Sequence, residues 1–278
     1  MPPDAQRCAR ATIEYDGTAF AGSQHQPNAR TVQGTLEEVL NRLTGERVRI
    51  RLAGRTDAGA HASGQVVAFC LPPGARRFTG DWSEFRRRLN AALPPDLVVR
   101  SLRAAPPGFD PRRDASWRVY RYRIRTGGDR RPGERHRTLE IDARLDVAAM
   151  RTAAQQLLGE RDFAALGGAD AGRRTVRDLR EVAVVGRGSL VEVRVTANAF
   201  LRRMVRSIVA LLVEVGLGRL TPDEAAALVE RPGRVLHGRA LPARGLTLER
   251  VIYESKTNHR AGAAGAGQDD SKAEEGEP

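Results

Sequence analysis

The residues best suited to chemistry lie in one short stretch, residues 54–61, which reads Gly-Arg-Thr-Asp-Ala-Gly-Ala-His. Glycines flank a single carboxylate, Asp57, and an apolar run typical of a buried strand follows at residues 65–69. A rigid strand beside the loop would hold this carboxylate still, as a nucleophile or a base requires. The same pattern fits an Asx-turn, in which Asp57 only bonds its own backbone. The loop alone leaves both interpretations open.

A second informative stretch, residues 119–125, alternates in the way that predicts a strand. The period of two separates an aromatic and apolar face from a basic face: Tyr120, Tyr122 and Ile124 against Arg121, Arg123 and Arg125. One face could stack against a base while the other meets phosphate. The alternative is a core face with two tyrosines and a solvated arginine face.

Composition favours a polyanionic partner. The chain has 278 residues, a net charge of +12 and a sequence pI near 11.0. Nearly all of the positive charge is arginine, since lysine occurs only at positions 256 and 272. The planar fork of donors on arginine suits phosphate recognition. Codon bias with a solvated arginine surface is the alternative.

Several function classes find no support. Cys8 and Cys70 stand far apart, and the five histidines show no metal-ligand spacing, which predicts a reducing compartment and no metal site. There is no apolar run of signal-peptide or membrane-spanning length, so we expect a cytoplasmic protein without a membrane contact. The Walker, GxGxxG and GxSxG motifs are also missing.

The elements that must position Asp57 form an α+β pattern over residues 1–105. Alternation predicts strands at residues 10–15, 48–52, 65–71 and 97–102. Helical spacing predicts a helix through Leu36 and Leu43, ended by Gly45, and a second through Phe85 and Leu89. The run Pro-Pro-Gly at residues 106–108 predicts a domain boundary.

A similar pattern recurs over residues 106–254 and predicts a second α+β domain. A helix capped by Asp146 precedes strands at residues 179–185 and 190–196, and a further helix begins near Leu201. Thr221 and Glu224 form a capping box for a short helix that runs to about Glu230. From residue 255 the chain loses periodicity, so residues 255–278 are expected to be a disordered tail.

Residues 53–67, A-G-R-T-D-A-G-A-H-A-S-G-Q-V-V, resemble the signature of the tRNA pseudouridine synthase A family, with Ala60 where valine is usual. Three more stretches resemble family motifs: R-x-Y-x-Y at 118–122, N-A-F-x-x-x-M-V-R at 198–206 and P-A-x-G-L-x-L at 242–248. The resemblance covers residues 8–253. Departures include Ser23, where tryptophan is usual, Pro111 and Arg113 in residues 109–113, and the Ala-Ala pair after Phe163.

The resemblance assigns roles residue by residue. It makes Asp57 the catalytic residue, with Arg55 beside it and Arg206 as its ion-pair partner. Tyr120 packs against the target base, and Leu246 lines the uracil pocket. No metal and no cofactor are implied.

The resemblance also implies a fold and a function. The expected fold is α+β, with two similar α/β-sandwich domains of ferredoxin or RRM-like type. Their antiparallel sheets join into one, and the active-site cleft lies between them. The expected activity is isomerisation of uridine to pseudouridine in tRNA, at positions 38, 39 and 40 of the anticodon stem-loop, by a homodimer. The alternatives are a catalytically silent RNA-binding protein, in which Asp57 is only a turn residue, and a synthase that acts on other positions.

Overall fold

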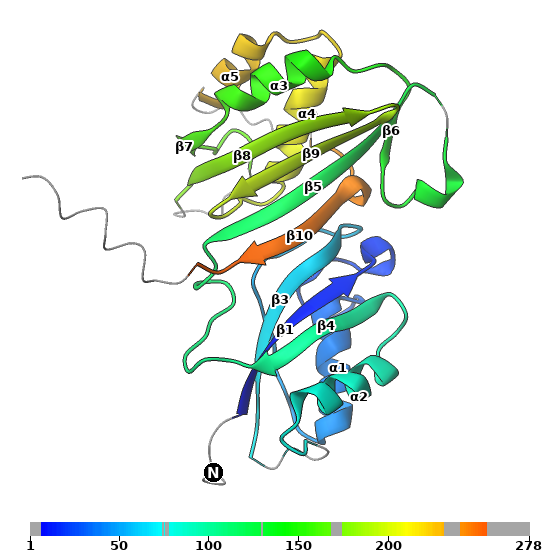
Figure 1. Ribbon diagram of the computed structural model, residues 1–278, viewed down its shortest axis with the longest axis vertical. Helices are drawn as coiled ribbons and strands as arrows, with labels where there is room; N and C mark the ends of the chain where they lie inside the picture. Colours follow the sequence, from blue (N-terminus) through cyan, green and yellow to red (C-terminus); the bar gives the residue numbers. More distant parts are fainter. Residues whose placement is uncertain are drawn as a thin grey trace, which may run out of the picture.

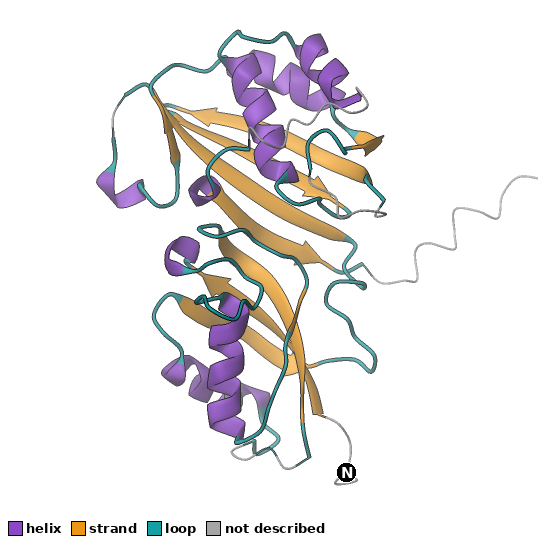
Figure 2. Ribbon diagram, turned by 180° about the vertical axis from the view of Figure 1, so that it is seen from behind, coloured by secondary structure: helices purple, strands orange, loops and turns teal. Residues whose placement is uncertain are grey.

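A single large sheet organises the protein (Figure 1). The computed structural model describes residues 7–73, 75, 78–128, 130–167, 174–230 and 240–254, so the predicted tail lies outside the described residues. Within these ranges, ten strands form the sheet, in the order β4-β1-β3-β10-β5-β9-β8-β7, with β2 beside β3 and β6 beside β5. Seen from behind, the helices lie in two groups on one face of the sheet (Figure 2).

The N-terminal half contains the first four strands and two helices. The elements are β1 (Arg7–Tyr15), α1 (Val32–Thr44), β2 (Arg51–Leu52), β3 (His61–Leu71), α2 (Trp82–Ala92) and β4 (Leu97–Ala104). Thr31 caps α1 by accepting a hydrogen bond from the Gly34 amide, and Gly45 ends the helix at φ 73°. The predicted elements are therefore present, although the strand expected at residues 48–52 is limited to Arg51 and Leu52.

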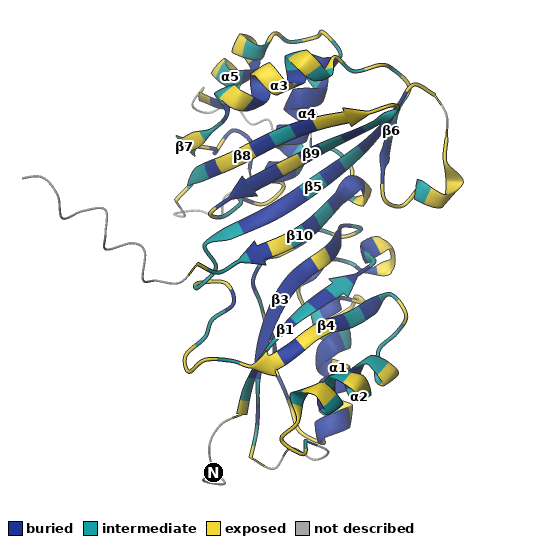
Figure 3. Cartoon of the chain, in the orientation of Figure 1, coloured by how far each residue is buried: buried dark blue, intermediate teal, exposed yellow. Residues whose placement is uncertain are grey.

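The C-terminal half repeats the combination of strands and helices. Its elements are β5 (Trp117–Thr126), β6 (Leu139–Ile141), α3 (Val147–Gln156), β7 (Gly159–Asp162), β8 (Val176–Arg187), β9 (Leu190–Ala197), α4 (Met204–Gly216), α5 (Pro222–Glu230) and β10 (Leu246–Ile252). All of α4 is buried except Arg206 and Glu214 (Figure 3). This helix begins at Met204, later than the expected start near Leu201, because Arg203 adopts a left-handed backbone with φ 65°.

The two halves join where the last strand enters the sheet. β10 pairs antiparallel with β5 and parallel with β3, with Thr247 opposite His61. The backbones come so close that a Cβ on Gly64 would lie 2.1 Å from the Glu249 carbonyl oxygen. Glycine is therefore required at this position. The chain is a mixed α+β protein with a large mixed sheet, and the predicted boundary lies in the connection from β4 to β5.

The contact between the two cysteines could not be predicted from their spacing. Cys8 and Cys70 lie directly opposite each other on β1 and β3 and form a disulfide. Antiparallel pairing brings together residues that are far apart in the sequence, so their separation could not show that they are unpaired. No helix in the described ranges is long and apolar enough to cross a membrane.

Candidate active site

All five residues predicted for the site line one pocket of about 800 Å³. Arg55 and Asp57 come from the loop between β2 and β3, and Tyr120 comes from β5. Arg206 lies in the first turn of α4, and Leu246 begins β10. The pocket therefore draws on both halves of the chain, next to the strand that joins them.

Buried hydrogen bonds fix the loop that carries the carboxylate. Gln65 binds both backbone groups of Gly54, since its Nε2 donates to the carbonyl at 2.7 Å and its Oε1 accepts from the amide at 3.2 Å. Thr56 is held at three points: its amide donates to Ser23 Oγ at 2.8 Å, its carbonyl accepts from the Ser23 amide at 3.1 Å, and its hydroxyl bonds the Tyr15 hydroxyl at 2.8 Å. The residue before the carboxylate therefore has little freedom.

Ser23 is one of the positions at which the sequence departs from the family pattern, and it is fully buried. Its hydroxyl supplies the acceptor for the Thr56 amide. The loop is thus anchored by a short polar side chain at this position.

Asp57 is paired with Arg206. Nη1 of Arg206 donates to Oδ2 of Asp57 at 2.6 Å, and the Arg206 Nε donates to the Leu241 carbonyl at 2.5 Å. The side chains are 14% and 30% exposed, respectively. Oδ1 of Asp57 accepts no hydrogen bond from the described residues, so it remains free to meet a substrate. Charge-assisted hydrogen bonds of this kind are strong and fix the orientation of the carboxylate.

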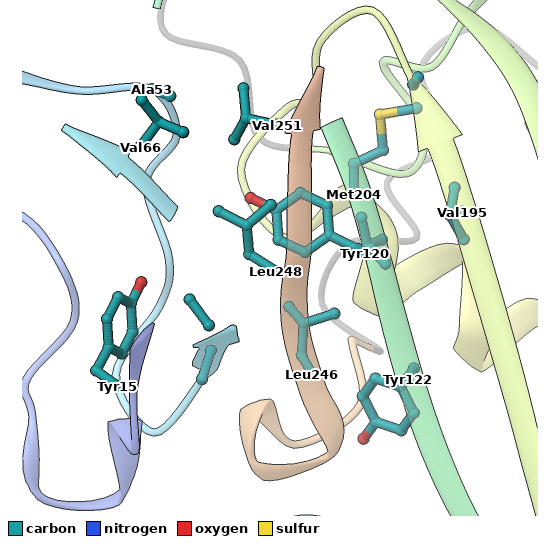
Figure 4. Close-up of a cluster of buried hydrophobic side chains, with 14 of the residues drawn as sticks. Tyr15, Ala53, Val66, Tyr120, Tyr122, Val195, Met204, Leu246, Leu248 and Val251 are labelled. Carbon is teal, nitrogen blue, oxygen red and sulfur yellow. The ribbon is translucent and has the colours of Figure 1, made fainter. Parts of the chain in front are cut away.

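Tyr120 and Leu246 form an apolar wall of the pocket. The ring of Tyr120 extends from β5 over β10, beside Leu248 (Figure 4). Its hydroxyl donates to the Arg55 carbonyl over a long 3.4 Å, and its ring meets Phe200 edge to face with centroids 5.1 Å apart. Burial raises the pKa of the Tyr120 hydroxyl well above its usual value. The hydroxyl therefore stays neutral at physiological pH.

The pocket is strongly basic. Among the described residues that line it, Asp57 is the only carboxylate, and the arginines are Arg55, Arg112, Arg118, Arg177, Arg202, Arg203 and Arg206. Four of these, Arg55, Arg112, Arg202 and Arg203, are exposed and form no ion pair with any described residue. Such guanidinium groups can bind phosphate without first breaking an existing pair.

The arginine face of β5 does not contribute to the pocket. Arg121 and Arg123 point to the opposite side of the sheet, where both pair with Glu192, at 3.4 and 2.8 Å. Arg125 pairs with Glu134. These three arginines already form ion pairs with carboxylates. The alternating pattern that suggested phosphate binding therefore belongs to a surface of ion pairs.

Sequence reasoning missed three groups that shape the pocket. Arg118 shares the face of Tyr120 by the same period of two, and this signal could have identified it. Phe200 lies within a recognised motif but had no assigned role. Tyr15 gave no signal, and Ser23 stood out only as a departure from the family pattern, because their contacts with Thr56 span 41 and 33 positions. No cluster of three or more His, Cys, Asp or Glu side chains that could hold a metal ion occurs in the described part of the chain.

Comparisons with known proteins identify the family of this chain. A family model described as tRNA pseudouridine synthase matches residues 11–112 and 153–254. The chain is 44% identical to tRNA pseudouridine synthase A of Geobacter sulfurreducens, over 89% of this chain and 100% of that protein. It is 42% identical to the protein of the same name from Myxococcus xanthus, covering 88% and 91%. The Chloroflexus aurantiacus protein of that name is 45% identical, covering 87% of each chain.

Among solved structures, a Cbf5-Nop10-Gar1 complex aligns with 74% of this chain and 45% of that chain. The identity is 14% and the TM-score 0.33, so this likeness adds nothing to the argument.

Proposed function

Because this chain belongs to the tRNA pseudouridine synthase family, we propose that it converts uridine into pseudouridine in tRNA, at positions 38, 39 and 40 of the anticodon stem-loop. The observation that carries the proposal is the Asp57–Arg206 pair in a basic pocket with an aromatic wall. The catalytic residue is Asp57.

The reaction explains why one carboxylate is enough. The bond from ribose C1′ to N1 of uracil breaks, the base rotates, and a bond from C1′ to C5 forms. N1 gains a proton and C5 loses one, so there is no net oxidation. The carboxylate of Asp57 can serve any of three routes: attack at C1′, addition to the base, or removal of a ribose proton. Its charge also stabilises the positive charge that develops on the sugar.

The pocket suits a nucleotide whose base has been turned out of the stack of neighbouring bases. The ring of Tyr120 and the side chain of Leu246 would hold the uracil, and Arg55 lines the pocket as an exposed side chain. The exposed guanidinium groups of Arg112, Arg202 and Arg203 would bind the flanking phosphates. Binding of tRNA should therefore weaken steeply with salt.

We further propose that the halves 1–105 and 106–254 are two similar sandwich domains with the active-site cleft between them, and that the protein works as a homodimer. Two observations support the domain proposal. The family model matches the chain in two separate segments, and each half has helices on the same face of the sheet.

Release of tritium from C5-labelled uridine in tRNA tests the proposal, because every turnover frees the hydrogen on C5. We expect release by the wild-type protein and none above background by Asp57→Asn, with tRNA affinity changed by no more than a few fold. Asp96→Asn is the matched control, since Asp96 pairs with Arg30 outside the pocket. A wild-type protein that binds tRNA without releasing tritium would be the silent RNA-binding protein.

A further inference from the structure

One buried arginine in the pocket has contacts unlike those of the other arginines there. Arg118 lies two residues before Tyr120 on β5, and it is only 7% exposed. Its guanidinium donates to four backbone carbonyls. Nη1 bonds Ala115 at 3.0 Å and Asn198 at 2.6 Å, and Nη2 bonds Ala53 at 3.4 Å as well as Arg112.

These carbonyls belong to three separate segments of the chain beside the pocket. Ala53 directly precedes the loop that carries Asp57. Asn198 precedes Phe200, whose ring packs on Tyr120. The other two carbonyls, those of Ala115 and Arg112, belong to the connection between the halves, where Arg112 lines the pocket. One side chain therefore sets the positions of the catalytic loop, the aromatic wall and this connection relative to one another.

The chemistry of this contact requires arginine. Arg118 forms no ion pair with a described carboxylate, and burial lowers its pKa. A buried cation without a counter-charge is costly unless dipoles surround it, and here four carbonyl oxygens do so. The planar guanidinium carries five donors in a rigid fork, whereas a lysine ammonium carries three donors on one nitrogen. The single ammonium nitrogen of a lysine cannot reach carbonyls on three separate segments at once.

We propose that Arg118 is a positioning residue for the isomerisation, which holds the catalytic loop and the aromatic wall in place relative to each other through the Ala53 and Asn198 carbonyls. This inference rests on the proposed function. It predicts a loss in turnover rather than in tRNA binding, because the guanidinium meets backbone carbonyls and its remaining surface is small. Displacing a catalytic group by about 1 Å can lower a rate by roughly 100-fold.

The test compares Arg118→Lys and Arg118→Gln with Arg125→Gln. Arg125 is the matched control because it lies on the same strand, is 5% exposed and bonds Glu134 and Ser189 outside the pocket. For each protein, kcat and KM for tritium release and the midpoint of thermal unfolding are measured.

We expect both Arg118 variants to lose at least about tenfold in kcat with KM changed less than about threefold. Arg125→Gln should lose stability to a similar extent yet keep its kcat within about twofold. Normal kcat in Arg118→Lys, an equal loss of kcat in Arg125→Gln, or failure of both Arg118 variants to fold would overturn the proposal and leave Arg118 as a stabilising residue. An inactive wild-type protein would instead refute the proposed function, so the two failures are distinct.

Discussion

Asp57 and Arg206 are separated by 149 positions in the sequence, and their side chains meet at 2.6 Å. One belongs to a loop of the N-terminal half and the other to the first turn of α4. Their contact depends on how the halves are joined at β3 and β10. The site is therefore sensitive to the fold as a whole.

Arg206→Ala should destabilise the protein because it leaves the Asp57 carboxylate without its counter-charge. Breaking a fully buried pair typically costs about 3–5 kcal/mol, and we expect less here because Asp57 is 30% exposed. Adding Asp57→Ala should cost less than the sum of the two single changes. Urea unfolding of the four proteins in this cycle measures the coupling. Strict additivity would show that the two side chains do not interact in solution.

Tyr120→Phe should retain most of the activity, because the hydroxyl makes only a long hydrogen bond of 3.4 Å to the Arg55 carbonyl. Tyr120→Leu should lose much more, since it removes the ring that packs on Phe200 and faces the base. Single-turnover rates with saturating tRNA compare the two variants. Equal losses would mean that the hydroxyl takes part in the chemistry, for instance as a proton carrier.

Ser23→Ala should lower both stability and turnover. The change removes the acceptor of the Thr56 amide in a buried position, and an unsatisfied buried donor costs about 1–3 kcal/mol. Ser83→Ala is a suitable control because Ser83 is exposed on α2. Chemical unfolding and tritium release are measured on each protein. A Ser23→Ala protein as stable and active as the control would mean that the loop does not depend on this hydrogen bond.

Gly64→Ala should force β3 and β10 apart, because the new Cβ would lie 2.1 Å from the Glu249 carbonyl oxygen. We expect a marked fall in thermal stability and loss of activity, since this junction brings the two halves of the pocket together. Gly133→Ala provides the comparison, as no atom lies within 4 Å of its added Cβ. Similar behaviour of the two variants would show that the junction tolerates a side chain.

His61 connects both halves next to the site. It is 1% exposed, its Nδ1 accepts from the Gly17 amide at 3.1 Å, and its Nε2 donates to the His136 carbonyl at 2.7 Å. The charged groups that face it are the carboxylate of Asp16 and the guanidinium of Arg137. Burial lowers the pKa of His61 from its ordinary value of 6.5, despite the opposing effect of its hydrogen bonds and of Asp16.

The lowered pKa of His61 predicts that the protein becomes less stable as the pH is lowered below about 6.5. In that range the unfolded chain binds a proton at this position while the folded protein does not, so lowering the pH favours unfolding. His61→Gln cannot titrate, and its unfolding free energy should change less between pH 7 and pH 5. Urea unfolding at several pH values measures both slopes. Identical slopes would assign the acid sensitivity to other groups.

The sequence alone determined the local features of this protein. Helical and strand periods depend on neighbouring residues, so the helices over Leu36 and Met150 and the alternation around Tyr120 could be predicted correctly. Four short motifs, around Asp57, Tyr120, Arg206 and Leu246, identified residues that line one pocket, because each motif is a local stretch of sequence that resembles the family. The charge of the chain likewise follows from composition alone.

Only the tertiary structure decided which distant groups meet. Arg118 bonds Asn198 across 80 positions, and Ser23 supports Thr56 across 33 positions. The pairing of Cys8 with Cys70 and the pairing of Arg123 with Glu192 were also hidden in the sequence. Such contacts are set by strand order and register, and these follow from the burial of the sheet face that the helices cover and from the close approach at Gly64. A hydrogen bond between distant residues leaves no periodic trace in the sequence, because it requires only that two positions meet once the chain has folded.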